Sequence, residues 1–172
     1  MQMDTLTNEE MRASKGWLTV STVEQLVAEC IGSVPVLCIV GRCRTGKTWA
    51  TVDWIEGRNN DLEHAAYVDC KGIGFGGEGV VRFDGVERDV RKDHYPKFAL
   101  DGIDIIVVDE PACNPALVKS LISQAAPDAG TTAHRLVVLL LQDVQHIEQF
   151  ELREKQFRCY STAGLPIRTT EF

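Results

Sequence analysis

The sequence contains no apolar stretch close to the ~20 residues that a membrane-spanning helix requires. The segment Met1–Lys15 is polar and lacks an apolar signal core, so we expect a cytoplasmic protein with no membrane partner. The six cysteines form no C-x-x-C pair, and the four histidines show no ligand spacing. These absences argue against a transmembrane protein, a zinc site and a disulfide framework.

Positive charge is also scarce. The formal net charge is −7, which does not favour a broadly basic surface for nonspecific nucleic-acid binding, although a local basic groove in an oligomer stays open. With 172 residues and 44% hydrophobic content, the chain can bury one good core. We therefore expect a polar N-terminal tail over residues 1–16 and a single domain over residues 17–172.

One motif is present in full: residues 41–48 read G-x-x-x-x-G-K-T and follow an apolar run directly. Glycine lets the backbone turn tightly, so that successive N–H groups and a helix N-terminus point at phosphate. Lys47 would reach the β- and γ-phosphates, and Thr48 would offer its hydroxyl to Mg²⁺. The residues expected to bind a nucleoside triphosphate are Gly41, Arg42, Cys43, Arg44, Thr45, Gly46, Lys47 and Thr48.

Apolar strand patterns alternate with helical patterns along the chain. This alternation predicts a three-layered α/β domain with a mostly parallel five-stranded sheet and a site at the carboxyl ends of the strands. The expected strands span residues 34–40, 65–69, 103–108, 135–141 and 157–163. A glycine-rich stretch over residues 72–79 is expected to be a flexible loop.

Four helices are expected, one before the first strand and three between the strands. A capping-box pattern over residues 21–24 predicts a helix that stops at Gly32. A second helix should run from Gly46 to about residue 56 with Gly57 as its C-cap. A third should span residues 115–125 with Asn114 as N-cap, and a fourth should span residues 143 to about 155.

The apolar strand before residue 109 ends in two adjacent acids, Asp109 and Glu110. At the carboxyl edge of the sheet, Asp109 could hold the Mg²⁺ shell beside Thr48, and Glu110 could polarise a water molecule. The alternative is an ordinary strand that ends in a solvated acidic turn. The expected metal-binding residues are therefore Thr48 and Asp109.

Together with the loop, Asp109 and Glu110 resemble the Walker B motif of P-loop ATPases that carry a catalytic glutamate, the class that includes AAA+ and RecA-like ATPases. The resemblance covers residues 34 to about 163. It implies an extra strand beside the P-loop strand, ending in a polar residue that senses the γ-phosphate. Gln142 stands at that position, where the alternative is a strand-end surface residue.

The resemblance to AAA+ proteins also implies an arginine finger near the fifth strand, where Arg153 and Arg158 lie. A finger supplied by a neighbouring subunit would neutralise charge on the transferred phosphoryl group, and so implies a homo-oligomer. For each arginine the alternative is a solvated surface position, and Arg168 is the candidate for a cation supplied by the same chain. We expect no C-terminal helical lid.

The expected activity is Mg²⁺-dependent ATP hydrolysis that drives an oligomeric motor, or a remodelling or assembly step, with DNA or a protein as partner. Adenine is favoured over guanine because the sequence has no N-K-x-D signature. Two alternatives stay open: a noncatalytic ATP-dependent switch or assembly factor, and a small-molecule or nucleotide kinase.

Overall fold

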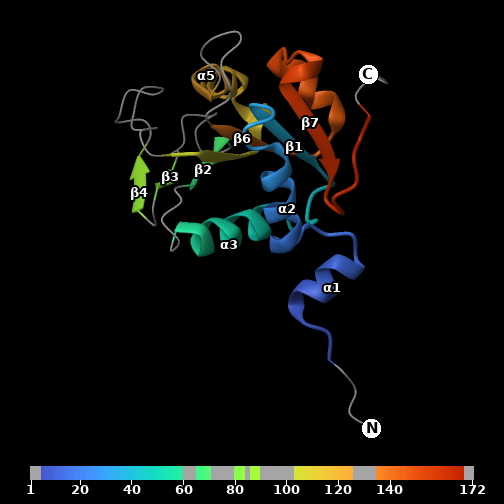
Figure 1. Ribbon diagram of the computed structural model, residues 1–172. Coiled ribbons are helices and arrows are strands. Elements are labelled where there is room, and N and C mark those ends of the chain that lie inside the picture. Colours follow the sequence, from blue (N-terminus) through green and yellow to red (C-terminus); the bar gives the residue numbers. More distant parts are fainter. Residues whose placement is uncertain are drawn as a thin grey trace.

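A computed structural model describes residues 5–59, 65–70, 80–83, 86–89, 103–125 and 135–168. These residues form an α/β fold in three layers, with a central sheet between two layers of helices (Figure 1). The predicted fold class, a parallel five-stranded sheet flanked by helices, is confirmed.

The central sheet has the strand order β4-β3-β2-β5-β6-β1-β7. Five neighbouring strands are parallel. They are β2 (Ala65–Asp69), β5 (Ile105–Asp109), β6 (Leu136–Leu141), β1 (Val36–Val40) and β7 (Phe157–Ser161). Because β6 lies between β5 and β1, the strand before residues 41–48 has an extra strand beside it, as the resemblance to P-loop ATPases implies.

Two strands that the sequence analysis did not predict extend this sheet at the β2 edge. β3 (Val80–Phe83) pairs antiparallel with β2, and β4 (Val86–Asp89) pairs antiparallel with β3. The loop predicted over residues 72–79 lies outside the described residues.

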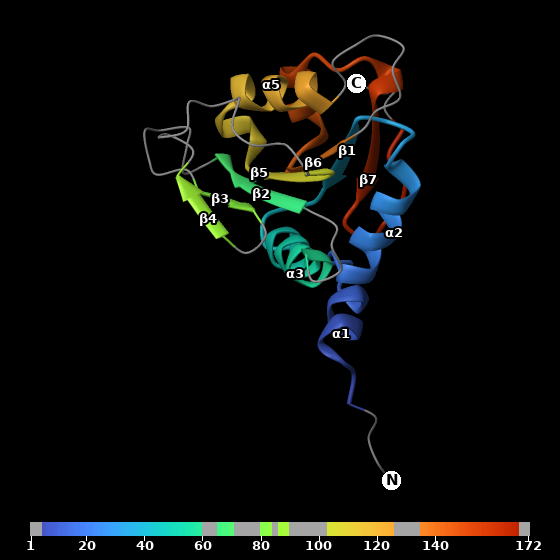
Figure 2. The same ribbon diagram turned by 60° about the vertical axis from the view of Figure 1, so that its left-hand side comes forward.

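Helices cover both faces of the sheet (Figure 2). α2 (Val20–Cys30) and α3 (Lys47–Asn59) lie on one face, and α5 (Pro115–Ala125) lies on the other with the 3-10 helix η2 (Val144–Phe150). Within the described ranges, no helix combines the length and apolar character needed to cross a bilayer.

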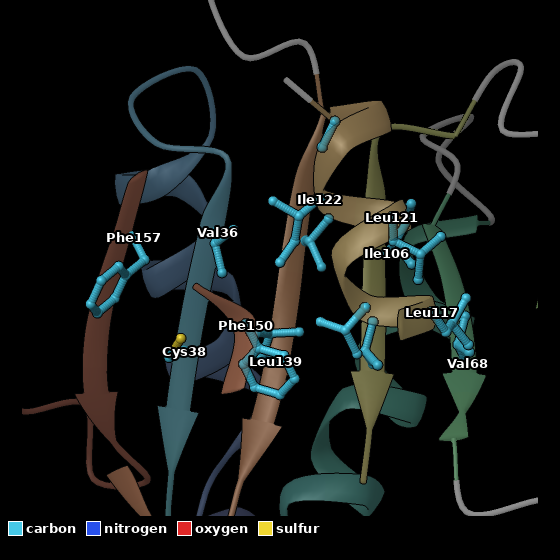
Figure 3. Close-up of a cluster of buried hydrophobic side chains, with 14 of the residues drawn as sticks. Val36, Cys38, Val68, Ile106, Leu117, Leu121, Ile122, Leu139, Phe150 and Phe157 are labelled. Atoms are coloured by element: carbon cyan, nitrogen blue, oxygen red, sulfur yellow. The ribbon is translucent and has the colours of Figure 1, made fainter. Parts of the chain in front are cut away.

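Each face of the sheet buries its own hydrophobic cluster. Alternation along β1 divides its side chains: Val36 and Cys38 join the cluster beneath α5, whereas Leu37 and Ile39 join the cluster beneath α2 and α3. Figure 3 shows the first cluster, with Leu117, Leu121 and Ile122 of α5 lying across the sheet. Because the central strands are buried on both faces, their sequences are continuously apolar.

The helix boundaries differ from the prediction where capping was the evidence. α2 starts at Val20, and its N-cap is Thr19, whose Oγ1 accepts a hydrogen bond from the Thr22 amide at 3.2 Å; the capping box predicted over residues 21–24 is therefore wrong. α3 continues through Gly57, which is not its C-cap. The predicted N-cap Asn114 is confirmed, because its side chain accepts from the Leu117 amide at 3.2 Å.

The helix predicted over residues 143–155 is also wrong. The segment forms η2 and a second short 3-10 helix, η3 (Glu154–Gln156), separated by Glu151 in the left-handed conformation with φ 52°. An ion pair of 3.4 Å between Lys119 Nζ and a Glu151 carboxylate oxygen joins this break to α5.

The polar tail predicted over residues 1–16 contains a helix, α1 (Asn8–Ser14). Its N-terminus has a capping box, in which Thr7 accepts from the Glu10 amide and Glu10 accepts from the Thr7 amide. Residues 1–4 lie outside the described residues.

Candidate functional site

The loop with the G-x-x-x-x-G-K-T motif, residues 41–48, connects the carboxyl end of β1 to the first turn of α3. Gly46 has φ 80°, a left-handed conformation that glycine adopts without steric cost. At Gly41, a Cβ atom would collide with the Thr162 side chain and lie 2.8 Å from Thr45 Oγ1. Glycine is thus favoured at position 46 by its backbone conformation and at position 41 by the close approach of two threonine side chains.

Lys47 lies at the centre of this loop and is only 8% exposed. Its Nζ donates hydrogen bonds to the carbonyl oxygens of Gly41 and Arg42, the latter at 2.8 Å. Burial lowers the pKa of Lys47, and the negative charge of Asp109 opposes that shift. The loop therefore encloses a cationic group close to its own backbone amides.

A cavity of about 340 Å³ opens above the loop. It is lined by residues from three separate parts of the sequence: Cys43, Arg44, Thr45, Gly46, Lys47, Thr48, Trp49, Asp109, Glu110 and Gln142. Of the predicted nucleotide-binding residues, Gly41 and Arg42 do not line the cavity but supply the carbonyl groups that hold Lys47. The structure thus brings the loop, the two acids and Gln142 together.

Asp109 is tied to the loop by a side-chain hydrogen bond. Thr48 Oγ1 donates to Asp109 Oδ2 at 2.5 Å, although the two residues are 61 positions apart in the sequence. The parallel pairing of β2 with β5 also brings Tyr67 to this carboxylate, and Tyr67 Oη donates to the same oxygen at 2.6 Å. Burial and the neighbouring Asp109 raise the pKa of Tyr67, so its hydroxyl stays a donor.

Tyr67 was not among the predicted site residues. The only sequence signal is a polar-tipped aromatic residue among the apolar residues of β2, two positions before the strand ends at Asp69. Its relevance depends on the register between β2 and β5, which places Tyr67 beside Val107.

Glu110 follows Asp109 and has a left-handed backbone, with φ 51° and ψ 49°. A non-glycine residue in this conformation costs roughly 1 kcal/mol or more, and such strain gathers at functional sites. Gln142, just beyond β6, donates from Nε2 to Glu110 Oε1 at 3.3 Å. The two residues predicted to orient water and sense phosphate are therefore in contact.

The N-terminal segment forms an outer wall of the loop that the sequence analysis did not predict. The Arg12 guanidinium of α1 lies 3.5 Å from the ring centroid of Trp49, and Arg12 Nη1 lies 3.2 Å from the position that a Cβ atom on Gly46 would take. The Leu18 amide donates to the Thr45 carbonyl oxygen at 2.9 Å.

The two arginines predicted to act as fingers do not line this cavity. Arg158 is near the amino end of β7, whereas the cavity lies at the carboxyl ends of the strands. Its Nη1 donates to the Glu29 carbonyl oxygen at 3.0 Å. Arg153 lies before that strand and is exposed. Arg168, the candidate for a cation from the same chain, follows a segment that turns back after β7, where the Ile167 amide donates to the Cys159 carbonyl oxygen, and it does not line the cavity.

The chemistry of the donors fits magnesium. Within the described residues, no group of three or more histidine, cysteine, aspartate or glutamate side chains could hold a metal by itself. The donors at this site are hard oxygen atoms, the Thr48 hydroxyl and the Asp109 carboxylate. Mg²⁺ is typically bound by few protein ligands of this kind, with water and phosphate completing its shell.

No protein-family model matches the chain, and a search of curated proteins finds no match. Since an α/β architecture of this type supports many activities, the function must be inferred from the local geometry of the loop, the acids and Gln142.

Proposed function

We propose that the chain binds ATP together with Mg²⁺ and hydrolyses the bond to the γ-phosphate. The observation that carries this proposal is the 2.5 Å hydrogen bond between Thr48 and Asp109 beside the enclosed Lys47. A loop rich in backbone amides, a buried ammonium group and a hydroxyl–carboxylate pair suit a phosphate chain with a divalent cation. The position of β6 between β1 and β5 supports the resemblance to P-loop ATPases of the catalytic-glutamate class.

Each residue has a distinct task in this proposal. The loop amides and Lys47 hold the phosphates. Thr48 donates its only hydroxyl hydrogen to Asp109, which leaves the lone pairs of its oxygen free to face the cation. A bound Mg²⁺ would neutralise charge on the phosphate oxygens.

Glu110 accepts a proton from, and orients, the attacking water. Gln142 holds one carboxylate oxygen of Glu110 at 3.3 Å, and its amide is close enough to the cavity to respond to the γ-phosphate. A substitution of Gln142 would therefore remove a hydrogen bond from Glu110, the residue proposed to orient the water.

We further propose a homo-oligomer in which Arg153 or Arg158 serves the cavity of a neighbouring copy. Both arginines are exposed, and neither reaches its own cavity. A motor, remodelling or assembly activity with DNA or a protein partner is the process we propose for such an assembly.

Calorimetry with ATP and ADP, combined with phosphate release, tests this function. We expect the wild-type protein to bind ATP with Mg²⁺ and to release phosphate. Lys47→Ala should abolish tight binding and leave the thermal transition nearly unchanged, because among the described residues the hydrogen bonds of Lys47 Nζ all go to its own loop. Wild-type protein that binds no nucleotide contradicts the proposal.

Two other outcomes would indicate a different function. Tight ATP binding without phosphate release, with or without DNA, would indicate a noncatalytic switch. Transfer of the labelled γ-phosphate to a small molecule would indicate a kinase.

A further inference from the structure

We propose that Tyr67 is a positioning residue that limits how Asp109 can bind a divalent cation and so makes the site selective for Mg²⁺ over Ca²⁺. The inference rests on the proposed function, because it concerns the cation that accompanies the nucleotide. It starts from the two hydroxyl groups, from Thr48 and Tyr67, that meet one carboxylate oxygen.

A carboxylate has about four lone-pair positions for hydrogen bonds or cations. On Asp109, Oδ2 accepts from Thr48 Oγ1 at 2.5 Å and from Tyr67 Oη at 2.6 Å, so both positions of this oxygen are filled. Oδ1 accepts from the Glu110 amide at 3.0 Å. Counting hydrogen bonds among the described residues, one acceptor position is left, and it is on Oδ1.

A carboxylate with one open position can meet a cation, or a water bound to the cation, through a single oxygen. It cannot chelate the cation through both oxygens. Mg²⁺ accepts this arrangement, since it keeps several waters and takes one or two carboxylates. Ca²⁺ takes six to eight oxygens and often uses a carboxylate in the bidentate mode. The hydrogen bonds on Asp109 therefore favour the smaller cation.

Tyr67 holds this arrangement firmly because both of its ends are fixed. Its ring packs against the hydrophobic cluster between the sheet and α3, and its strand is paired with the strand that carries Asp109. Asp109 itself is only 8% exposed, and it lines the cavity above the loop.

Tyr67→Phe isolates this effect. The substitution keeps the ring and its packing but frees one position on Oδ2, so that Asp109 can bind a cation through both oxygens. Thr48 keeps its own hydrogen bond and its place in the loop. Tyr160→Phe is a matched control, because Tyr160 is also a strand tyrosine whose hydroxyl faces a carboxylate, Glu29, but on the β7 side of the sheet.

The experiment measures the affinity of a fluorescent ADP analogue in MgCl₂, in CaCl₂ and in EDTA, with thermal unfolding to verify folding. We expect the wild-type protein and Tyr160→Phe to bind the analogue about tenfold or more tightly with Mg²⁺ than with Ca²⁺. In Tyr67→Phe this ratio should fall about fivefold or more, since a hydrogen bond to a charged group contributes a factor of about ten or more.

The outcomes distinguish a failure of the proposed nucleotide binding from a failure of the role proposed for Tyr67. Wild-type protein that binds no analogue in any cation would overturn both the function and the role of Tyr67. A wild-type preference for Mg²⁺ that is unchanged in Tyr67→Phe, or a wild-type protein without any preference, would overturn only the role of Tyr67. If Tyr67→Phe does not fold, Tyr67→Leu also lacks the hydroxyl and carries the same expectation.

Discussion

Glu110 combines a strained backbone with a fixed side chain. Its left-handed conformation follows the last residue of β5 and turns the chain directly into the 3-10 helix η1 (Pro111–Cys113). The turn directs the carboxylate toward Gln142 instead of leaving it to sample solvent. In the proposed hydrolysis, this contact would reduce the reorganisation needed to orient a water molecule.

Changing Glu110 to Gln should separate binding from hydrolysis. Glutamine has nearly the same shape and can still accept from Gln142, but it cannot take up a proton. We expect ATP affinity to stay within about threefold of wild type and phosphate release to slow by about 10²-fold or more. Calorimetry and a phosphate-release assay provide the two measurements.

Glu148→Gln is the matched control for this variant, because Glu148 is exposed on η2 and does not line the cavity. It should hydrolyse ATP at the wild-type rate. If Glu110→Gln does so as well, Glu110 has a structural role only.

The thiol of Cys159 makes the free energy of unfolding depend on pH. Burial in β7 raises the pKa of its thiol from 9.0 to about 12. Above pH 9 the unfolded chain loses this proton while the folded chain keeps it, so the stability contribution is complete below pH 9 and is lost as pH rises toward 12. Between about pH 8 and pH 10 the loss from this one thiol is on the order of 1 kcal/mol.

Urea unfolding at these two pH values measures that loss. Cys159→Ala should show a decrease smaller by about 1 kcal/mol than wild type, whatever its absolute stability. Cys43→Ala is the control, since Cys43 is exposed, and it should keep the wild-type decrease. Equal decreases in all three proteins would contradict the argument.

At the scale of elements, α1 is held to the domain by polar and cation–π contacts instead of a buried face. None of its residues is buried, and Figures 1 and 2 show it at the periphery beside α2 and α3. A Glu9 carboxylate oxygen accepts from both the amide and the hydroxyl of Ser21 at 2.9 Å, and Arg12 covers Trp49. Because a two-turn helix is marginal by itself, these contacts decide whether α1 stays docked.

Arg12→Ala should release α1 without unfolding the domain. An exposed cation–π contact contributes about 0.5–1 kcal/mol, so we expect hydrogen–deuterium exchange in residues 8–16 to accelerate about two- to fivefold. The global free energy of unfolding should change by less than about 1 kcal/mol. Mass spectrometry of the N-terminal peptide measures the exchange.

Lys15→Ala is the comparison, because Lys15 lies 4.6 Å from the ring centroid of Trp17, whereas Arg12 covers Trp49 of α3. Exchange should remain close to wild type in this variant. The same acceleration in both variants would show that Arg12 does not hold α1.

The sequence predicted the elements whose signals are local. The G-x-x-x-x-G-K-T loop and the five parallel strands follow from continuous patterns, and the Asn114 cap follows from one side chain and its neighbours. The segment over residues 143–155 forms two 3-10 helices on either side of Glu151, whose left-handed backbone is not signalled by the residue type or by the apolar spacing.

Site residues brought in by strand register could not be predicted in the same way. Tyr67 reaches Asp109 only because β2 pairs with β5, and Arg12 reaches Trp49 only because the N-terminal segment folds against the loop. Both contacts join residues more than thirty positions apart, where apolar periodicity carries no information on which side chains meet.

At the scale of the whole molecule, the cavity lies at the carboxyl ends of the parallel strands and the candidate arginines lie at the amino ends. The loop, Asp109 and Gln142 follow the carboxyl ends of their strands, whereas Arg153 and Arg158 lie near the amino end of β7. A head-to-tail contact between copies would bring the amino edge of one against the carboxyl edge of the next. Such heterologous contacts close into rings or extend into filaments.

This geometry predicts that hydrolysis requires an assembled homo-oligomer with Arg153, or failing that Arg158, directed at a neighbour's γ-phosphate. Arg153 is the better candidate, because the Arg158 guanidinium already donates to the Glu29 carbonyl oxygen. An arginine finger contributes about 10³-fold or more in rate where one operates, so a chain with both arginines changed to alanine should be nearly inactive while still binding ATP.

Mixing subunits distinguishes a trans finger from a group in the same chain. The doubly changed chain has an intact loop, and a Lys47→Ala chain has intact arginines, so each is inactive alone. In an equal random mixture about a quarter of the head-to-tail interfaces pair an intact loop with an intact finger, and phosphate release should recover to about that fraction of wild type. Mixtures that co-assemble but stay inactive, or a monomer with full activity, would rule out a finger from the neighbour and direct attention to Arg44, the arginine that lines the cavity in the same chain.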